Sequence, residues 1–281
     1  MVSWKEKTKL KGSFMVRASL LVLVSVICGT TTHLFWFQDF NLRDIFSADE
    51  TAFFWKQLCT HTINEKGQIC HGSTIFKDRI SIILCASCLG EKIPPLVIGK
   101  AENPRCFKDQ DRNSFGIHYV SNKKGWMTKN LFNTLLEVWD KKLISDNRKI
   151  LLFVDNLSGN RVDADFSNIK VIFFPSNTTS HLQPLDAGLI FILKTKYKSL
   201  LQSKIVANVP LVDVSLNLKA TSLLDAVKLI GLSWAEIEPD SVKKCFLKCG
   251  FPVPIWIHWL KILIQNERLY CHLSWGSVPM I

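Results

Sequence analysis

The sequence lacks the features that mark several specialised classes of protein. Charged residues make up only 21% of the chain and hydrophobic residues 47%, a balance that excludes a disordered, collagen-like or coiled-coil protein. No internal repeat or low-complexity tract occurs in the 281 residues, a length that can bury a sizeable core. Acidic residues are scarce, 24 against 35 lysines and arginines, and the net charge of +11 favours an anionic partner without identifying one.

The nine cysteines lack the spacing of a disulfide framework or a zinc site. Cys85 and Cys88 form a CxxC pair, but no second CxxC or HxxxH follows at zinc-finger spacing. The surrounding segment reads as a strand, in which residues three apart face opposite sides, so we predict a structural, reduced pair. Cys245 and Cys249 recur with apolar neighbours at helical spacing, which predicts a buried stripe. We expect no zinc site, and unpaired, buried cysteines of this kind suit a reducing compartment.

No long apolar run is present that would span a bilayer as a helix, which needs about 20 residues. The run from Ala18 to Cys28 has eleven residues and follows a lysine-rich stretch. It resembles the apolar core of a secretory signal, although no A-x-A cleavage site follows it. The alternatives are a buried strand or a segment foreign to the rest of the protein. A membrane partner is therefore not expected.

Strand-like and helix-like segments alternate in the middle of the chain, which predicts an α/β domain. We predict strands at 44–50, 79–88, 96–98, 149–154 and 170–174, and helices starting near Thr128, Asp186, Ser222 and Pro239. Thr128 is a good N-cap, and Gly250 marks the stop of the last helix. The strands 149–154 and 170–174 are nearly continuous apolar runs, typical of strands buried on both faces. The polar stretch 176–184 is predicted to be a loop.

Three aspartates stand at the ends of predicted elements. Asp49 ends the first strand, Asp155 follows the strand 149–154, and Asp186 opens a helix. Functional groups gather beyond the strand ends of α/β sheets, and converging carboxylates repel one another unless a divalent cation neutralises them. Oxygen ligands suit Mg²⁺ or Mn²⁺, and two such ions about 3.5–4 Å apart can activate water against a phosphodiester. Taken singly, each aspartate also fits a helix cap or a turn.

Three sequence blocks around these aspartates resemble a known family. The blocks DIFSADET at 44–51, LLFVDN at 151–156 and FPSNTTSHLQPLD at 174–186 are similar to the signature blocks of the DDE endonuclease domain of pogo/Tigger-type transposases. This family includes Tigger-derived, jerky-like and centromere-protein-B-like proteins. Shorter matches occur at 70–72, 95–100, 122–127, 224–226 and 244–246. The resemblance runs from about Phe37 to Phe251, with the blocks in the family's order.

The resemblance implies a ribonuclease-H-like fold, a mixed sheet flanked by helices, with a helical C-terminal extension. It implies that Asp49, Asp155 and Asp186 form a catalytic triad that binds two Mg²⁺ or Mn²⁺ ions for DNA strand cleavage and transfer. DNA is then the expected partner, and the nucleus is the expected location. The alternative location is the secretory route, if residues 18–28 act as a signal sequence. A homo-oligomer is compatible with the resemblance. Candidate DNA contacts on the helix opened by Asp186 are Lys194, Lys196 and Lys198, although an ordinary solvated helix face would look the same.

The resemblance divides the chain into a non-family segment (1–33), a DDE endonuclease domain (34–205), a helical part (206–251) and a Trp-rich tail (252–281). Ala52, Asn160 and Ala187 stand where family members usually carry Gly, His and Gln, and the turn 60–62 lacks the usual Pro-Asp-Arg. The helix-turn-helix domains that normally precede this domain are not found in the sequence. We therefore expect weak, sequence-tolerant, salt-sensitive DNA binding and no efficient transposition.

Two functions follow as hypotheses. The first is a DDE nuclease that retains its metal chemistry, because all three acids are present. The second is a catalytically inactive, nuclear nucleic-acid-binding protein of transposon origin, favoured by the substitutions at Ala52, Asn160 and Ala187.

Overall fold

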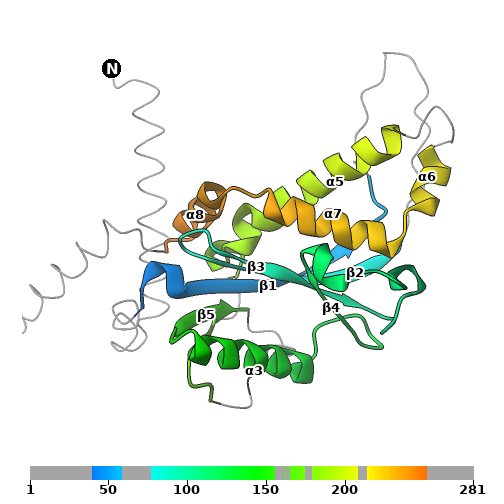
Figure 1. Ribbon diagram of the computed structural model, residues 1–281. Coiled ribbons are helices and arrows are strands. Elements are labelled where there is room, and N and C mark those ends of the chain that lie inside the picture. Colours follow the sequence, from blue (N-terminus) through cyan, green and yellow to red (C-terminus); the bar gives the residue numbers. More distant parts are fainter. Residues whose placement is uncertain are drawn as a thin grey trace, which may run out of the picture.

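Six strands of the chain form one mixed sheet in the computed structural model, which describes residues 40–58, 77–155, 162, 165–174, 179–207 and 214–251 (Figure 1). The strands are β1 (Ile45–Phe54), β2 (Arg79–Ser87), β3 (Lys92–Gly99), β4 (His118–Ser121), β5 (Ile150–Val154) and β6 (Ile169–Phe173). Their order in the sheet is β4-β3-β2-β1-β5-β6. β1 and β3 pair antiparallel with β2, whereas the pairs β3–β4, β1–β5 and β5–β6 are parallel.

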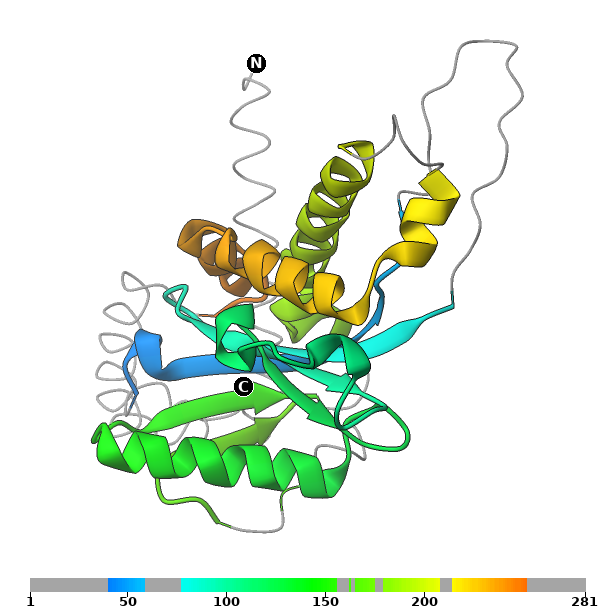
Figure 2. The same ribbon diagram turned by 45° about the vertical axis from the view of Figure 1, so that its right-hand side comes forward.

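Helices cover both faces of this sheet (Figure 2). The helices are α3 (Lys129–Ser145), α4 (Thr179–Leu182), α5 (Ile190–Val206), α6 (Val214–Ala220), α7 (Leu223–Ala235) and α8 (Pro239–Lys248). A π-helical turn, η5 (Leu185–Leu189), precedes α5, and single 3-10 turns occupy Leu42–Asp44, Arg105–Phe107 and Arg112–Phe115. α3 lies on one face of the sheet, and α5, α7 and α8 lie on the other (Figure 1). This mixed sheet with flanking helices confirms the predicted α/β class.

Two hydrophobic clusters fill the space on either side of the sheet, because side chains alternate along each strand. On β1, Ile45 and Phe53 belong to the cluster that contains residues of α5, α7 and α8. Phe46 and Ala48 belong to the cluster beneath α3. The five residues of β5 are all buried, as predicted for a central strand. The face of β1 that carries Ile45 and Phe53 also carries Asp49, and this places Asp49 on the side of α5.

β1 is longer than predicted. The sequence placed its end near Glu50, but the strand continues to Phe54 and pairs with β2 over its whole length. Asp49 therefore does not end a strand, and this prediction was wrong. The residues after Asp49 are mostly β-branched or aromatic, which favours continuation of the strand when a partner such as β2 is available.

β3 contains two prolines that the sequence placed before the strand. Pro94 and Pro95 lie inside β3, at an irregularity in its pairing with β2. On the opposite side, β4 pairs with β3 only from Leu96 onward. The prolines are tolerated because, in the described part of the chain, no outer strand requires a backbone N–H from them.

Two further predictions on local structure need correction. β6 is not buried on both faces, because it forms an edge of the sheet and most of its residues are only half-buried. The run of apolar residues could not reveal this position, because it does not show which strands pair with β6 on either side. The stretch 176–184 is not wholly a loop, because α4 forms within it.

The predicted helix starts near Thr128, Ser222 and Pro239 agree with the structure, whereas α5 begins at Ile190, after the π-helical turn that contains Asp186. The Thr128 hydroxyl accepts a hydrogen bond from the Leu131 N–H at the start of α3. Ser222 and Asp225 form a capping box at the start of α7. Pro239 is the first residue of α8, and Gly250 follows its end with a φ of +83°, a conformation that favours glycine.

The predicted placement of two cysteines on opposite faces of a strand, and of two others on a buried helical stripe, is confirmed. Cys85 and Cys88 are free and buried in the two different hydrophobic clusters, so they lie on opposite faces of the sheet. Cys245 and Cys249 are also free and buried.

Several predicted features lie outside the described residues. They are the segments 1–33 and 18–28, the turn 60–62, the match at 70–72, Asn160 and the tail 252–281. Among the residues described, none forms a helix of the length and apolarity that crossing a membrane requires. The proposed domain boundaries stay a prediction.

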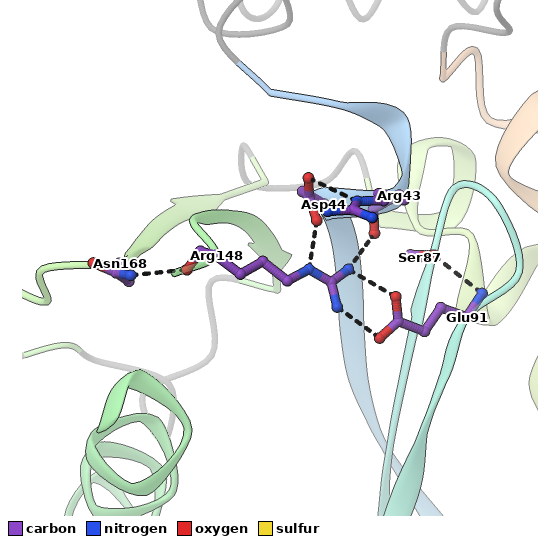
Figure 3. Close-up of polar contacts among 6 residues, drawn as sticks. All are labelled: Arg43, Asp44, Ser87, Glu91, Arg148 and Asn168. Carbon is purple, nitrogen blue, oxygen red and sulfur yellow. Dashed lines mark hydrogen bonds and ion pairs between the residues drawn. The ribbon is translucent and has the colours of Figure 1, made fainter. Parts of the chain in front are cut away.

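An ion-pair network joins the starts of β1 and β5 (Figure 3). The Arg148 guanidinium donates to Asp44 Oδ1 at 2.5 Å and to both carboxylate oxygens of Glu91. It also donates to the Arg43 carbonyl oxygen, while the Arg148 carbonyl oxygen accepts from the Asn168 side chain. Asp44 is 6% exposed, and its charge is balanced by this guanidinium and, at 3.5 Å, by that of Arg43. The network fixes one end of the parallel β1–β5 pair.

Candidate active site

Asp49 and Asp155 occupy neighbouring positions on two parallel strands. The last paired residues of β1 and β5 are Ala48 and Val154, so Asp49 and Asp155 come next on their respective chains. β5 ends there, whereas β1 continues beside β2. Asp49 is 9% exposed, and Asp155 is half-buried. The divergence of the two strands leaves both carboxylates at the end of the β1–β5 pair.

Gln183 attaches the segment that carries Asp186 to β1. Its side chain is completely buried, accepts a hydrogen bond from Ser47 Oγ at 2.9 Å and donates one to the Ala48 carbonyl oxygen at 3.0 Å. Asp186 follows three residues later, in the π-helical turn η5. Asp186 lies inside this turn, whereas the N-cap positions of η5 and α5 are Pro184 and Leu189, so the interpretation of Asp186 as a helix cap is wrong. The backbone of this turn bends at Gly188, which is non-helical.

Asp49 is the most strongly perturbed acid of the three. Burial, together with the negative charges of Asp186 and Asp155, raises its pKa to about 8, against the opposing hydrogen bond from the Glu50 N–H. Burial and the charge of Asp155 also raise the pKa of Asp186, whereas a hydrogen bond with Asp49 and the charge of Lys194 lower it. Asp49 therefore holds a proton at neutral pH and shares a hydrogen bond with Asp186.

The mutual repulsion of these carboxylates suits a divalent cation. A cation would favour the ionised form of Asp49, which burial and its neighbours now disfavour, and carboxylate oxygens are the ligands that Mg²⁺ and Mn²⁺ prefer. The chemistry of the donor set therefore fits such an ion. Within the described residues, however, no three His, Cys, Asp or Glu side chains are arranged so that they could hold a metal ion directly. The acids interact, but their oxygens do not form a ligand set.

The three predicted DNA-contacting lysines of α5 do not form one group. Lys194 Nζ donates to Thr51 Oγ1 at 2.9 Å, two residues beyond Asp49 on the same face of β1. Burial and the charge of Lys198 lower the pKa of Lys194, while Asp186 and Asp49 oppose that shift. Lys196 instead pairs with Glu236, directly after α7, at 3.4 Å. Lys194 thus points to the acids, and Lys196 points to a neighbouring helix.

The role of Gln183 was not predicted, although the residue lies within the third sequence block. The signal was weak, because an amide in a polar stretch looks like any loop residue. A cavity of about 580 Å³ also escaped prediction; it lies along β6 and the residues before it, and none of the three acids lines it.

We expect Gln183→Met to lower the free energy of unfolding by about 1–3 kcal/mol, because it leaves the buried Ser47 hydroxyl and Ala48 carbonyl without this partner. Urea unfolding followed by circular dichroism measures the change. The double variant with Ser47→Ala is the control, because it removes one orphaned group and should recover part of the loss. Equal stability of Gln183→Met and the parent protein would show that the amide does not hold this segment.

Residues 77–246, more than half of the chain, match the family described as DDE superfamily endonuclease. The chain therefore belongs to this family, as the resemblance of its sequence blocks predicted. Asp155 and Asp186 lie within the matched residues, and Asp49 lies before them.

The chain is similar to Tigger transposable element-derived protein 4 of Mus musculus, with 30% identity over 89% of this chain and 49% of the relative. It is also 28% identical to Major centromere autoantigen B of Homo sapiens, over 74% of this chain and 34% of that protein. The chain thus spans about half or less of the length of these curated relatives. A looser likeness links it to the solved "Mos1 transposase paired-end complex with left transposon end", with 12% identity, 85% of this chain and 62% of that chain covered, and a TM-score of 0.41.

Proposed function

We propose that this chain is a transposase-derived DDE endonuclease domain that binds DNA and cleaves its strands with Mg²⁺ or Mn²⁺. The observation that carries the proposal is the interaction of three aspartates around the buried Asp49, whose pKa of about 8 reflects burial and two neighbouring carboxylates. Such clusters of mutually repelling acids are typical of functional sites. Family membership supports the same reading, since the family is described as an endonuclease.

In this proposal Asp49, Asp155 and Asp186 hold two metal ions. The ions supply activation of the attacking water and stabilisation of the leaving oxygen. The protein contributes position: β1 and β5 fix the first two acids side by side, and Gln183 fixes the segment of the third. Binding of the ions requires Asp49 to release its proton, so metal affinity should rise with pH up to about pH 8.

Lys194 is the lysine of α5 best placed to contact a bound phosphate. It reaches the face of β1 that carries Asp49, and it is half-buried beside the acids. Lys196 is less suited, because Glu236 already balances its charge. Lys198 lies near enough to lower the pKa of Lys194, and it would add positive charge to the same approach. DNA as the partner makes the nucleus the expected location.

A plasmid-nicking assay tests this function. With Mg²⁺ or Mn²⁺ the protein should convert supercoiled plasmid to the open circular form, and Asp155→Ala should remove this activity because it removes a metal ligand. Glu137→Gln, which alters an exposed carboxylate on α3, is the matched control and should keep full activity. Metal-independent nicking, or equal nicking by Asp155→Ala, would contradict the proposal.

A second candidate is a catalytically inactive protein that binds nucleic acid with the same face. It is favoured by the absence, within the described residues, of a formed ligand set around the acids. Ala187 adds to this view, because it stands next to Asp186 and has no hydrogen-bonding side chain. Salt-dependent DNA binding without any metal-dependent nicking would select this candidate.

A further inference from the structure

A tight loop before α3 displays a tryptophan to solvent. Asn122 organises this loop: its Oδ1 accepts from the backbone N–H of Gly125 and of Trp126, and its Nδ2 donates to the Trp126 carbonyl oxygen. Gly125 has a φ of +66°, a left-handed conformation that favours glycine. The loop is therefore fixed by its own hydrogen bonds, and it holds the Trp126 side chain 53% exposed.

One neighbour of the indole is a cation. The guanidinium carbon of Arg79, at the start of β2, lies 4.9 Å from the centre of the Trp126 ring. This is a cation–π contact, in which a planar guanidinium covers part of the indole while more than half of the side chain stays accessible. A fixed, half-exposed indole with an arginine beside it has the chemistry of a stacking platform for a nucleic-acid base.

The surface around Trp126 is strongly basic. Lys123 and Lys124 belong to the same loop and are exposed, and the aliphatic part of Lys100 lies against Gly125. Among the residues that the structure describes, no carboxylate forms an ion pair with Arg79, Lys100, Lys123 or Lys124. Four unbalanced cations around one exposed aromatic ring favour a polyanion with flat bases, that is, a nucleic-acid strand.

The loop is also connected to the candidate active site. The Met127 N–H, next to Trp126, donates to Glu50 Oε1 at 3.4 Å. Glu50 follows Asp49 on β1, but its side chain points to the opposite face of the sheet, toward α3. The platform therefore lies across β1 from the acids, where a strand leaving the site could pass.

We propose that Trp126 and Arg79, with Lys100, Lys123 and Lys124, form a subsite across β1 from the three aspartates that stacks an unpaired base of single-stranded DNA. The subsite rests on the proposed function, because it takes the DNA that the three aspartates act on. Stacking on Trp126 requires a base whose ring face is accessible. Along a duplex, the ring faces of the bases are covered by the neighbouring base pairs. The subsite therefore binds single strands in preference to duplex DNA.

Fluorescence anisotropy of a labelled oligothymidine of about 12 nucleotides tests this subsite on the full chain. Trp126→Ala should weaken binding of the oligothymidine about 5- to 150-fold, with a much smaller effect on a duplex of equal length. Trp126→Phe should restore most of the affinity, because it keeps a stacking ring. The dependence on salt between about 50 and 200 mM should be unchanged in Trp126→Ala, because no charge is removed.

Two controls separate stacking from loss of folding. Leu232→Ala removes a side chain of similar exposure (56%) on α7 and should bind like the parent protein. An oligonucleotide with abasic sites keeps its phosphates but has no bases to stack, so the unaltered protein should bind it more weakly than oligothymidine. Equal binding of the abasic and normal strands, or unchanged affinity in Trp126→Ala, would overturn the subsite. If Asp155-dependent nicking persists in that case, the proposed function stands; if the unaltered protein neither binds nor nicks DNA, both proposals fail.

Discussion

Asp49→Asn should stabilise the metal-free protein at pH 8, although it removes a residue of the candidate active site. Burial and two neighbouring acids raise the pKa of Asp49 from 3.8 to about 8. Between these values the native state retains a proton that the unfolded state has released, so stability falls as the pH rises. Each pKa unit corresponds to about 1.4 kcal/mol, and we expect the neutral asparagine to add a few kcal/mol to the free energy of unfolding.

Urea unfolding at several pH values measures this effect. The difference between the variant and the parent should be absent below pH 4, grow through the range up to pH 8 and stay constant above it. Added Mg²⁺ should make the parent protein more stable than the variant at pH 8. The ion binds the native parent and stabilises it, whereas the asparagine variant binds the ion weakly and is stabilised little. Glu137→Gln, at an exposed position on α3, should change neither curve. A pH-independent difference would show that Asp49 is not the perturbed group.

Arg148→Ala should lower the free energy of unfolding by about 2–4 kcal/mol. The variant removes the closer of the two guanidinium groups beside Asp44, which is 6% exposed, and leaves only Arg43 at 3.5 Å; a poorly balanced buried charge is costly. The expected loss is below that of a fully buried pair because Glu91, the other partner, is 41% exposed and solvent screens it.

The double variant Arg148→Met with Asp44→Asn distinguishes the lost charge balance from lost packing. It removes both charges, and we expect it to be more stable than Arg148→Ala alone. Lys243→Ala breaks the exposed pair with Asp240 on α8 and should leave the urea midpoint nearly unchanged. If Arg148→Ala and Lys243→Ala shifted the urea midpoint equally, the network would have no special role in joining β1 to β5.

Local patterns predicted most of the elements that position the site. β5 could be recognised because five consecutive apolar residues indicate a buried strand, and Asp155 followed directly from its end. The start of α3 was equally clear, because the Thr128 cap depends on residues within one turn. These features are set by neighbours in sequence, which a single chain displays.

The missing parts depend on contacts between distant residues. The length of β1 is set by its pairing with β2, and the role of Gln183 by hydrogen bonds to residues 135 and 136 positions away. The divergent directions of Lys194 and Lys196 likewise depend on which strand or helix packs against each face of α5. These contacts between distant residues cannot be read from residue types alone. The sequence therefore indicated that the three acids belong to one site, but not which residues fix their positions.

The two edges of the sheet differ in what they offer to a second molecule. On one side β4 is only four residues long, and the part of β3 beyond it carries Pro94 and Pro95, which have no N–H to donate. On the other side β6 contains no proline, and no described strand pairs with its outer edge. Strand addition between copies is therefore favoured at one edge alone, so an assembly built in this way closes at two molecules and does not grow into a fibre.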